Sequence, residues 1–323
     1  MFTRVPGHDL PHDIGMRFPR TIAGSLVTGR RCVSMISTEV RHRLINTGNV
    51  RLHVVEAGPL SGEPVVLLHG FPDFWIGWRA QIGALAAAGY RVVVPDQRGY
   101  NISSKPKGIR QYALPKLLDD LAGLADAMGL ERLHLVGHDW GGIVAWSAGV
   151  VMPSCLASLT VLNAPHPEAL FPYVLRSPSQ ILRSSYAAFF QFPIVPEALL
   201  RARQFALLVR AVERSSCPGA FTADDITAYR QAWEQPGAIS AMLNWYRALR
   251  FRPQMTEPID VPTLVLWGMR DRFLEPGLAR SSLAFCRDGE LQTFSNATHW
   301  LQRDEPAAVS AAIIAFISKH RIT

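Results

Sequence analysis

Apolar and polar residues follow two different spacings between about residue 50 and residue 162. Short runs rich in β-branched residues predict strands, and longer stretches with apolar residues at helical spacing predict helices. The predicted strands are Arg51–Ala57, Pro64–His69, Arg91–Pro95, Arg132–Val136 and Ser158–Leu162, and the predicted helices are Trp78–Ala88, Pro115–Met128 and Gly142–Met152. Strands that alternate with helices in this way are typical of a parallel sheet with crossover helices.

The alternation stops at about residue 163. From residue 165 to residue 252 the pattern is helical, rich in aromatic residues and interrupted by prolines. Alternation then returns with predicted strands at Thr263–Trp267 and Leu291–Phe294 and predicted helices at Pro276–Phe285 and Pro306–Ser318. The pattern therefore predicts an α/β core, residues 39–164 and 253–323, that carries an all-helical insertion, residues 165–252.

Residues 1–38 precede the first predicted strand. We expect a flexible tail, or an artefact of an upstream start codon with Met35 as the true start. The short apolar stretch 22–27 comes before Arg30 and Arg31, which is the reverse of the order in a secretory signal. The sequence also lacks a run of about 18 uncharged apolar residues, the length that a membrane-spanning helix requires. A cytoplasmic protein without a spanning segment is the expectation.

Composition narrows the class of protein further. With 48% hydrophobic and 18% charged residues in 323, the chain should fold around a large core. Its formal charge is +7, but much of that excess lies in the arginine-rich first 43 residues. No basic cluster interleaved with aromatic residues follows, so a nucleic-acid partner is not expected. The cysteines lie too far apart to suggest a metal site, and we expect reduced thiols at Cys32, Cys155, Cys217 and Cys286.

A candidate nucleophile stands between a predicted strand and a predicted helix. The residues from Gly137 to Gly142 read Gly-His-Asp-Trp-Gly-Gly, with Asp139 at the centre of a G-x-nucleophile-x-G turn. Small residues on both sides are needed because this tight turn lifts the central side chain above the sheet. The alternative is that Asp139 only caps the following helix, since Asp is a favoured N-cap residue.

Two later segments favour the catalytic interpretation. Asp271 lies on a loop just after a predicted strand, and His299 lies on a loop between the last strand and the last helix. Nucleophile, acid and histidine thus occur in the chain order of the Ser-Asp-His type of triad. The main rival acid position, after the strand that ends at Leu162, is occupied by Asn163, which does not ionise. Poorer rivals, which fall before a strand or within a helix, are Glu257, Asp260 and Glu275.

A second short motif, His69-Gly70-Phe71-Pro72, closes another predicted strand. In a site of this kind the backbone N–H of Phe71 is expected to point at a developing oxyanion, and the N–H of Trp140 would be the second donor.

Taken together, these motifs resemble the α/β-hydrolase fold, in particular its epoxide hydrolase and haloalkane dehalogenase branch, which uses an aspartate nucleophile. The resemblance covers about residues 45–320 and includes Val94-Pro95-Asp96-Gln97-Arg98-Gly99-Tyr100, similar to the family's P-D-x-R-G loop. We expect structural roles for Asp96 and Arg98. The chain departs from many relatives at Asn101-Ile102-Ser103, in a supporting loop. The resemblance implies a mostly parallel sheet flanked by helices, with an all-helical cap inserted after the sixth strand.

The helical insertion bears on the choice between epoxide and halide. Epoxide hydrolases of this branch use two cap tyrosines that hold and protonate the epoxide oxygen. The segments around Tyr186 and Tyr246 resemble those of the two tyrosines, with Tyr173 and Tyr229 as fallback candidates. The alternative is that both are half-buried cap residues. A haloalkane dehalogenase would carry a halide-binding Asn at the position of Phe71, or a second cap Trp.

The resemblance therefore implies an epoxide hydrolase that converts an apolar epoxide and water to a vicinal diol through an ester on Asp139. The substrate is expected to contact aromatic residues, namely Phe71, Phe74, Trp140, Phe189 and Phe190. No metal or organic cofactor is expected. A haloalkane dehalogenase and a ligand-sensing protein without turnover are the alternatives, and a homodimer is left open.

Overall fold

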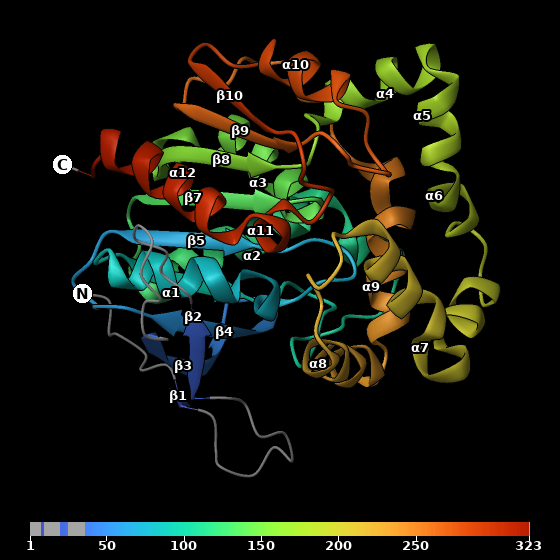
Figure 1. The fold of residues 1–323 in the computed structure, drawn as a ribbon, viewed down its shortest axis with the longest axis horizontal. Coiled ribbons are helices and arrows are strands. Elements are labelled where there is room, and N and C mark those ends of the chain that lie inside the picture. The colour runs from blue at the N-terminus through green and yellow to red at the C-terminus, as the bar shows by residue number, and fades with distance from the viewer. Residues whose placement is uncertain (1–7, 10–19, 25–35, 323) are drawn as a thin grey trace.

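The computed structural model describes residues 8–9, 20–24 and 36–322. In these residues ten strands form one sheet in the order β1-β3-β4-β6-β5-β7-β8-β9-β10, with β2 paired to β3 (Figure 1). The strands are β1 (His8–Asp9), β2 (Thr21–Gly24), β3 (Ile36–Asn46), β4 (Arg51–Ala57), β5 (Pro64–Leu68), β6 (Arg91–Pro95), β7 (Leu133–His138), β8 (Leu156–Leu162), β9 (Thr263–Gly268) and β10 (Gly289–Phe294). Neighbours from β6 to β10 are parallel, and the pairs that involve β1 to β4 are antiparallel.

Helices cover both faces of the sheet (Figure 1). One face is covered by α1 (Arg79–Ala87) and α12 (Pro306–Lys319), which contact each other, and the other by α2 (Leu114–Met128) and α3 (Trp140–Val151). Because the parallel strands are enclosed on both sides, every residue of β7, β8 and β9 is buried. This is why their sequences read as nearly continuous apolar runs.

The predicted helical insertion consists of six α-helices between β8 and β9. They are α4 (Pro167–Arg176), α5 (Pro178–Arg183), α6 (Ser185–Phe189), α7 (Val195–Ser215), α8 (Ala223–Glu234) and α9 (Ala238–Ala248). In Figure 1 they lie together on the right of the sheet. Aromatic residues after β5 and β7 contact α8 and α9, so the insertion lies over the carboxyl ends of these strands.

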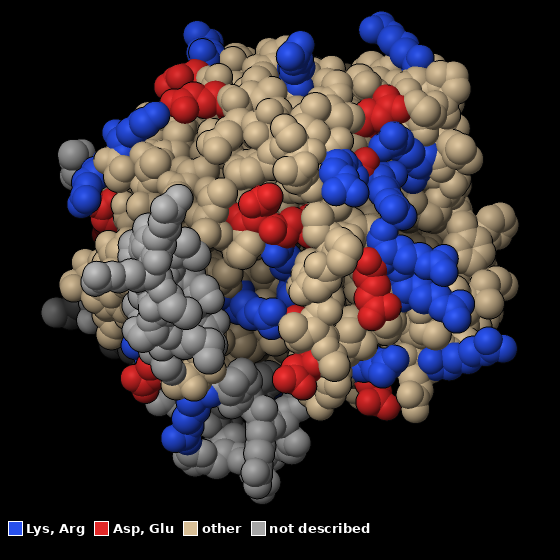
Figure 2. Space-filling model, viewed as in Figure 1, with Lys and Arg blue, Asp and Glu red and all other residues tan. Residues whose placement is uncertain are grey.

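The remaining helices are short connections or belong to the carboxyl-terminal part. They are η1 (Trp75–Trp78), η2 (Ile109–Tyr112), η3 (Pro153–Cys155), η4 (Leu249–Phe251), α10 (Gly277–Leu283) and α11 (Leu301–Asp304). Among all the helices that the structure describes, none combines the length and the apolar character needed to cross a bilayer. Basic side chains gather on the right of the molecular face in Figure 2, where Figure 1 places α6, α7 and α9.

The amino-terminal region differs from a uniform tail where the structure describes it. Strand β3, which was not among the predicted strands, crosses the predicted boundary between residues 38 and 39. β2 pairs with β3 and buries Ile22. Much of the predicted tail, including Met35 and Cys32, lies outside the described residues. The apolar pattern of β3 is hidden by its polar residues because this antiparallel strand is partly exposed.

Candidate active site

Asp139 lies in the sharp turn between β7 and α3. Its backbone has φ +51° and ψ −118°, a conformation that L-residues rarely adopt. The glycines on either side permit the turn, because a Cβ at Gly137 would lie 2.3 Å from the carbonyl oxygen of Gly141. A Cβ at Gly141 would in turn lie 2.2 Å from the carbonyl oxygen of Leu68. The Asp139 side chain makes no N-cap hydrogen bond to α3, so the capping interpretation has no such bond to support it.

The two carboxylate oxygens of Asp139 face different partners. Oδ1 accepts a 2.8 Å hydrogen bond from the backbone N–H of Phe71, whereas Oδ2 lies 3.6 Å from Nε2 of His299. Burial raises the pKa of Asp139, while the charge of His299 and the backbone amides of Phe71 and Trp140 oppose that rise. The amides predicted to stabilise an oxyanion thus both act on this carboxylate.

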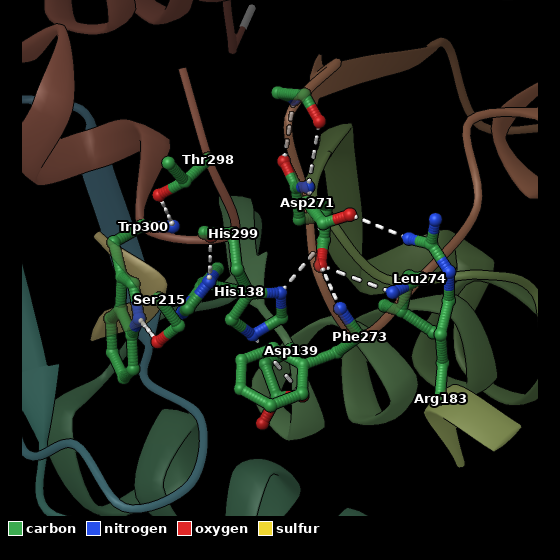
Figure 3. Close-up of polar contacts among 12 residues, drawn as sticks. His138, Asp139, Arg183, Ser215, Asp271, Phe273, Leu274, Thr298, His299 and Trp300 are labelled. Atoms are coloured by element: carbon green, nitrogen blue, oxygen red, sulfur yellow. Dashed lines mark hydrogen bonds and ion pairs between the residues drawn. The ribbon is translucent and has the colours of Figure 1, made fainter. Parts of the chain in front are cut away.

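Asp271 follows β9 and is buried in a full set of hydrogen bonds (Figure 3). Its Oδ2 accepts from Nδ1 of His299 at 2.8 Å and from Nδ2 of Asn163 at 2.6 Å. Its Oδ1 accepts from the backbone amides of Phe273 at 2.7 Å and Leu274 at 3.0 Å. A carboxylate that accepts hydrogen bonds from four donors is fixed in position.

The hydrogen bonds of His299 fix its orientation. Because Nδ1 donates to Asp271, Nε2 is left to face Asp139. Burial alone would lower the pKa of His299, but the charges of Asp271 and Asp139 outweigh it, so the net shift of this pKa is upward. Nε2 of His138 donates to the backbone carbonyl of His299 at 2.9 Å and so supports the loop that carries His299 (Figure 3). Such a histidine can take a proton from water and share the resulting charge with Asp271.

Tyr186 on α6 and Tyr246 on α9 meet above this site. Their ring centroids are 5.9 Å apart at an interplanar angle of 77°. Burial and the charge of Asp139 raise the pKa of Tyr186, and burial, Tyr186 and Asp139 raise the pKa of Tyr246. Both phenols therefore remain protonated and can donate hydrogen bonds.

The two fallback tyrosines are engaged elsewhere. The hydroxyl of Tyr229 donates to the buried carboxylate of Asp73, and burial and the neighbouring Glu275 raise the pKa of Tyr173. Neither of these partners belongs to the Asp139, Asp271 and His299 cluster.

Aromatic side chains enclose the tyrosine pair. Three of the predicted substrate-binding residues meet the ring of Tyr246 edge-on, with ring centroids 5.0–5.2 Å away: Phe71, Trp140 and Phe190. The other two lie one layer further out, with Phe74 against Tyr229 and Phe189 against Phe190. The walls around the tyrosine hydroxyls are therefore mostly apolar.

Sequence reasoning missed several supporting residues. Asn163 bridges two strand ends, because it donates to Asp271 and accepts from the backbone amide of Gly268 at 2.8 Å. Phe273 connects the two halves of the site, with ring centroids 5.1 Å from His299 and 5.7 Å from Tyr186. The sequence signal that could have indicated a supporting role for Asn163 was its position directly after a buried strand. Among the described residues, no group of His, Cys, Asp and Glu side chains has the arrangement of a metal site.

Comparison with known proteins identifies the family. Residues 63–306 match the alpha/beta hydrolase fold family. The chain belongs to this family. It is 44% identical over 280 residues to the AB hydrolase superfamily protein YfhM of Bacillus subtilis (strain 168), covering 86% of this chain and 98% of that protein. It is also 36% identical over 284 residues to epoxide hydrolase 4 of Homo sapiens, with coverage of 85% and 78%.

Solved structures of the same family are similar throughout the core. The crystal structure of a Bacillus megaterium epoxide hydrolase in complex with an inhibitor superimposes with a TM-score of 0.79 at 29% identity. The match covers 85% of this chain and 99% of that one. The predicted fold class, a mostly parallel sheet flanked by helices in an α/β-hydrolase arrangement, is confirmed.

Proposed function

We propose that the protein is an epoxide hydrolase that converts an apolar epoxide and water to a vicinal diol. The observation that carries the proposal is the pair of tyrosines Tyr186 and Tyr246, whose ring centroids lie 5.9 Å apart above a partly buried carboxylate, Asp139, that also faces a histidine–aspartate pair. Here the helices of residues 165–252 act as a cap that supplies both phenols.

In the first step, Oδ2 of Asp139 attacks the less hindered ring carbon and the C–O bond of the epoxide breaks. Oδ2 is the attacking atom because Oδ1 is held by the Phe71 amide. The departing oxygen receives a proton from one tyrosine while the other donates a hydrogen bond to it. A phenol suits this step, since the alkoxide that forms is far more basic than a phenolate. The product is a hydroxyalkyl ester on Asp139.

In the second step, His299 removes a proton from water, which attacks the carbonyl carbon of the ester. The charge that develops on Oδ1 is stabilised by the amides of Phe71 and Trp140. Asp271 orients the ring and stabilises the imidazolium. The acyl C–O bond then breaks, and His299 returns its proton to the departing diol oxygen. The second proton of the water, left on the new carboxyl group, reprotonates the phenolate, and Asp139 is regenerated as a carboxylate. The sequence of steps needs no metal or organic cofactor.

The relatives support an epoxide rather than a halide substrate. Several that are 32–37% identical to this chain carry the name epoxide hydrolase, among them epoxide hydrolase A of Mycobacterium tuberculosis at 33%. A halide site would need an Asn where this chain has Phe71, or a second cap Trp, whereas the indole N–H groups of Trp233 and Trp245 donate to backbone carbonyls. A ligand sensor would not need His299 held between two carboxylates.

A single-turnover experiment in ¹⁸O-water tests the proposal. With enzyme in excess over styrene oxide, the first diol should be unlabelled because its new oxygen comes from Asp139, and the peptide that contains Asp139 should gain the label. Asp139→Ala should remove turnover without loss of the folded circular dichroism spectrum. Labelled diol in the first turnover would contradict the covalent route, and release of halide from a haloalkane would point to the alternative enzyme.

A further inference from the structure

The outer edge of the helical insertion exposes an unusual amount of apolar surface. Nine of the twelve large apolar side chains that are exposed in the described residues lie between residues 171 and 207. We call this set the apolar edge: Phe171, Leu175, Ile181, Leu182, Phe192, Ile194, Val195, Leu199 and Leu207. The most exposed are Leu175 at 82%, Ile194 at 78% and Leu182 at 75%. An exposed apolar cluster of this kind marks a surface that binds something.

The helices that carry the apolar edge are neighbours along the insertion. Helices α4, α5 and α6 follow one another along the side of the molecule remote from the sheet, and α7 continues below them (Figure 1). Phe171 and Leu175 are one helical turn apart and so project from the same side of α4. The cluster therefore belongs to one flank of the insertion.

The helices of this flank are rich in arginine, and carboxylates of neighbouring elements, Glu275 beside Ser177 and Ser179 and Glu234 near Arg201, offset only part of that charge. Between Glu168 and Glu213 the chain has a single carboxylate, Glu197, and Nη1 of Arg247 binds it at 2.6 Å. The same stretch has no lysine and holds five arginines, Arg176, Arg183, Arg201, Arg203 and Arg210. All but Arg183 are exposed. Figure 2 shows basic side chains gathered on this side of the molecule.

A hollow beside the apolar edge is lined in part by Tyr246, one of the two candidate active-site tyrosines. Its volume is about 630 Å³, and its lining includes Phe171 of the apolar edge, Ala188 of α6, Arg250 and Tyr246. A molecule that reaches the apolar edge would thus meet an opening whose lining includes one of the two active-site tyrosines.

We propose that the apolar edge binds peripherally to the surface of an anionic lipid bilayer. Such a surface attracts apolar side chains that lie beside arginines. The apolar side chains enter the boundary between headgroups and acyl chains, and the guanidinium groups bind the anionic headgroups. A second copy of this chain is a poorer occupant. In a two-fold symmetric dimer the same basic flank would face itself, and like charges would oppose the contact.

Binding at a bilayer also suits the hydrolysis of an apolar epoxide, an inference that rests on the proposed function. An apolar epoxide partitions into lipid, and a hollow that opens beside the bound flank would admit it next to Tyr246 without passage through water.

Vesicle flotation tests the proposal with the full chain. Vesicles of phosphatidylcholine mixed with phosphatidylglycerol should bind the protein at least tenfold more strongly than phosphatidylcholine alone. Arg176→Gln and Arg203→Gln should each weaken binding to the mixed vesicles about fivefold. Leu175→Ser combined with Leu182→Ser should weaken it at least tenfold. The matched controls are Leu60→Ser, at a side chain that is 62% exposed outside the apolar edge, and Arg132→Gln, an exposed arginine outside it.

The three edge variants replace exposed side chains only, so melting temperature and hydrolysis of dissolved styrene oxide should match the wild type. Equal binding to both kinds of vesicle, or edge variants that bind like the controls, would overturn the proposal. A dimer in analytical ultracentrifugation that the leucine variants dissociate, without any effect on vesicles, would assign the edge to a second copy instead. Vesicle binding without epoxide turnover would contradict the proposed function and leave this proposal standing.

Discussion

Replacing Gly70 with alanine tests the geometry on which the proposed mechanism depends. A Cβ at this position would lie 2.4 Å from Cβ and 2.5 Å from Oδ1 of Asp139. Both distances are far shorter than any van der Waals contact, and the obstacle is the candidate nucleophile itself. Asp139 would have to move away from the Phe71 amide that now donates to Oδ1 at 2.8 Å. The substitution thus disturbs the oxyanion site without removing any catalytic group.

The size of the effect follows from the lost contact. Removing one oxyanion donor typically slows a reaction about 10²–10³-fold, or about 2.7–4 kcal/mol in the barrier. The oxyanion forms only when water attacks the ester, so Gly70→Ala should slow ester hydrolysis by about that factor. Crowding should also lower the free energy of unfolding by about 1–3 kcal/mol.

The assay is single-turnover mass spectrometry with styrene oxide, in which the mass of the protein rises by that of the epoxide while the ester persists. The Gly70→Ala variant should accumulate this ester, whereas the wild type should show little of it. Gly129→Ala is the matched control, because φ of +64° makes alanine cost about 1–2 kcal/mol there, although no atom lies within 4 Å of the new Cβ. Wild-type turnover by Gly70→Ala would refute the assignment of Asp139 and Phe71.

Three further predictions concern the acid, the base and the amino-terminal strand. Tyr186→Phe and Tyr246→Phe should each slow ester formation about 10–100-fold, and the double variant should hardly form the ester at all. Hydrolysis of the preformed ester, followed by rapid-quench kinetics, should be unchanged. A double variant that forms the ester at the wild-type rate would exclude the two tyrosines from the mechanism. Ester hydrolysis needs neutral His299, whose pKa is raised by Asp271, so its rate should fall as pH drops through that pKa. Asp271→Asn should slow ester hydrolysis. It should also shift the acid limb of the pH profile to lower pH, because burial then outweighs the remaining charges and lowers the pKa of His299. An acid limb that does not move would show that a group other than His299 titrates there. Ile22→Ala should lower the free energy of unfolding by about 2 kcal/mol, since Ile22 is buried where β2 pairs with β3. Turnover should be unaffected. An unchanged midpoint of urea unfolding would show that β2 contributes no stability.

The order and type of the core elements were predictable because each depends on a local pattern. Strands β5, β7, β8 and β9 are continuous apolar runs, as strands enclosed on both faces must be. Strand β3 escaped prediction because its partly exposed side chains mix polar and apolar types. The bounds of the predicted helices differ from those of α1, α2 and α3 by a few residues at most.

The candidate nucleophile, acid and base were also readable from the sequence. Each follows a predicted strand, and the carboxyl ends of parallel strands meet along one edge of the sheet. Asp139, Asp271 and His299 therefore had to come close to one another, whatever the details of packing. The structure adds the distances of 2.8 Å and 3.6 Å that link them through the two nitrogens of His299.

Only the tertiary structure decided which groups outside these local patterns join the site. Tyr186 and Tyr246 lie on different helices of the insertion, and no local pattern could bring their rings within 5.9 Å. Asn163 was set aside as an acid, yet its amide is one of the four donors that hold Asp271 in place. Leu175 and Leu182, apolar residues on helices, would be placed in a core by sequence alone, whereas they face solvent. Helical spacing records which residues share a face, but what covers that face depends on contacts between segments distant in the chain.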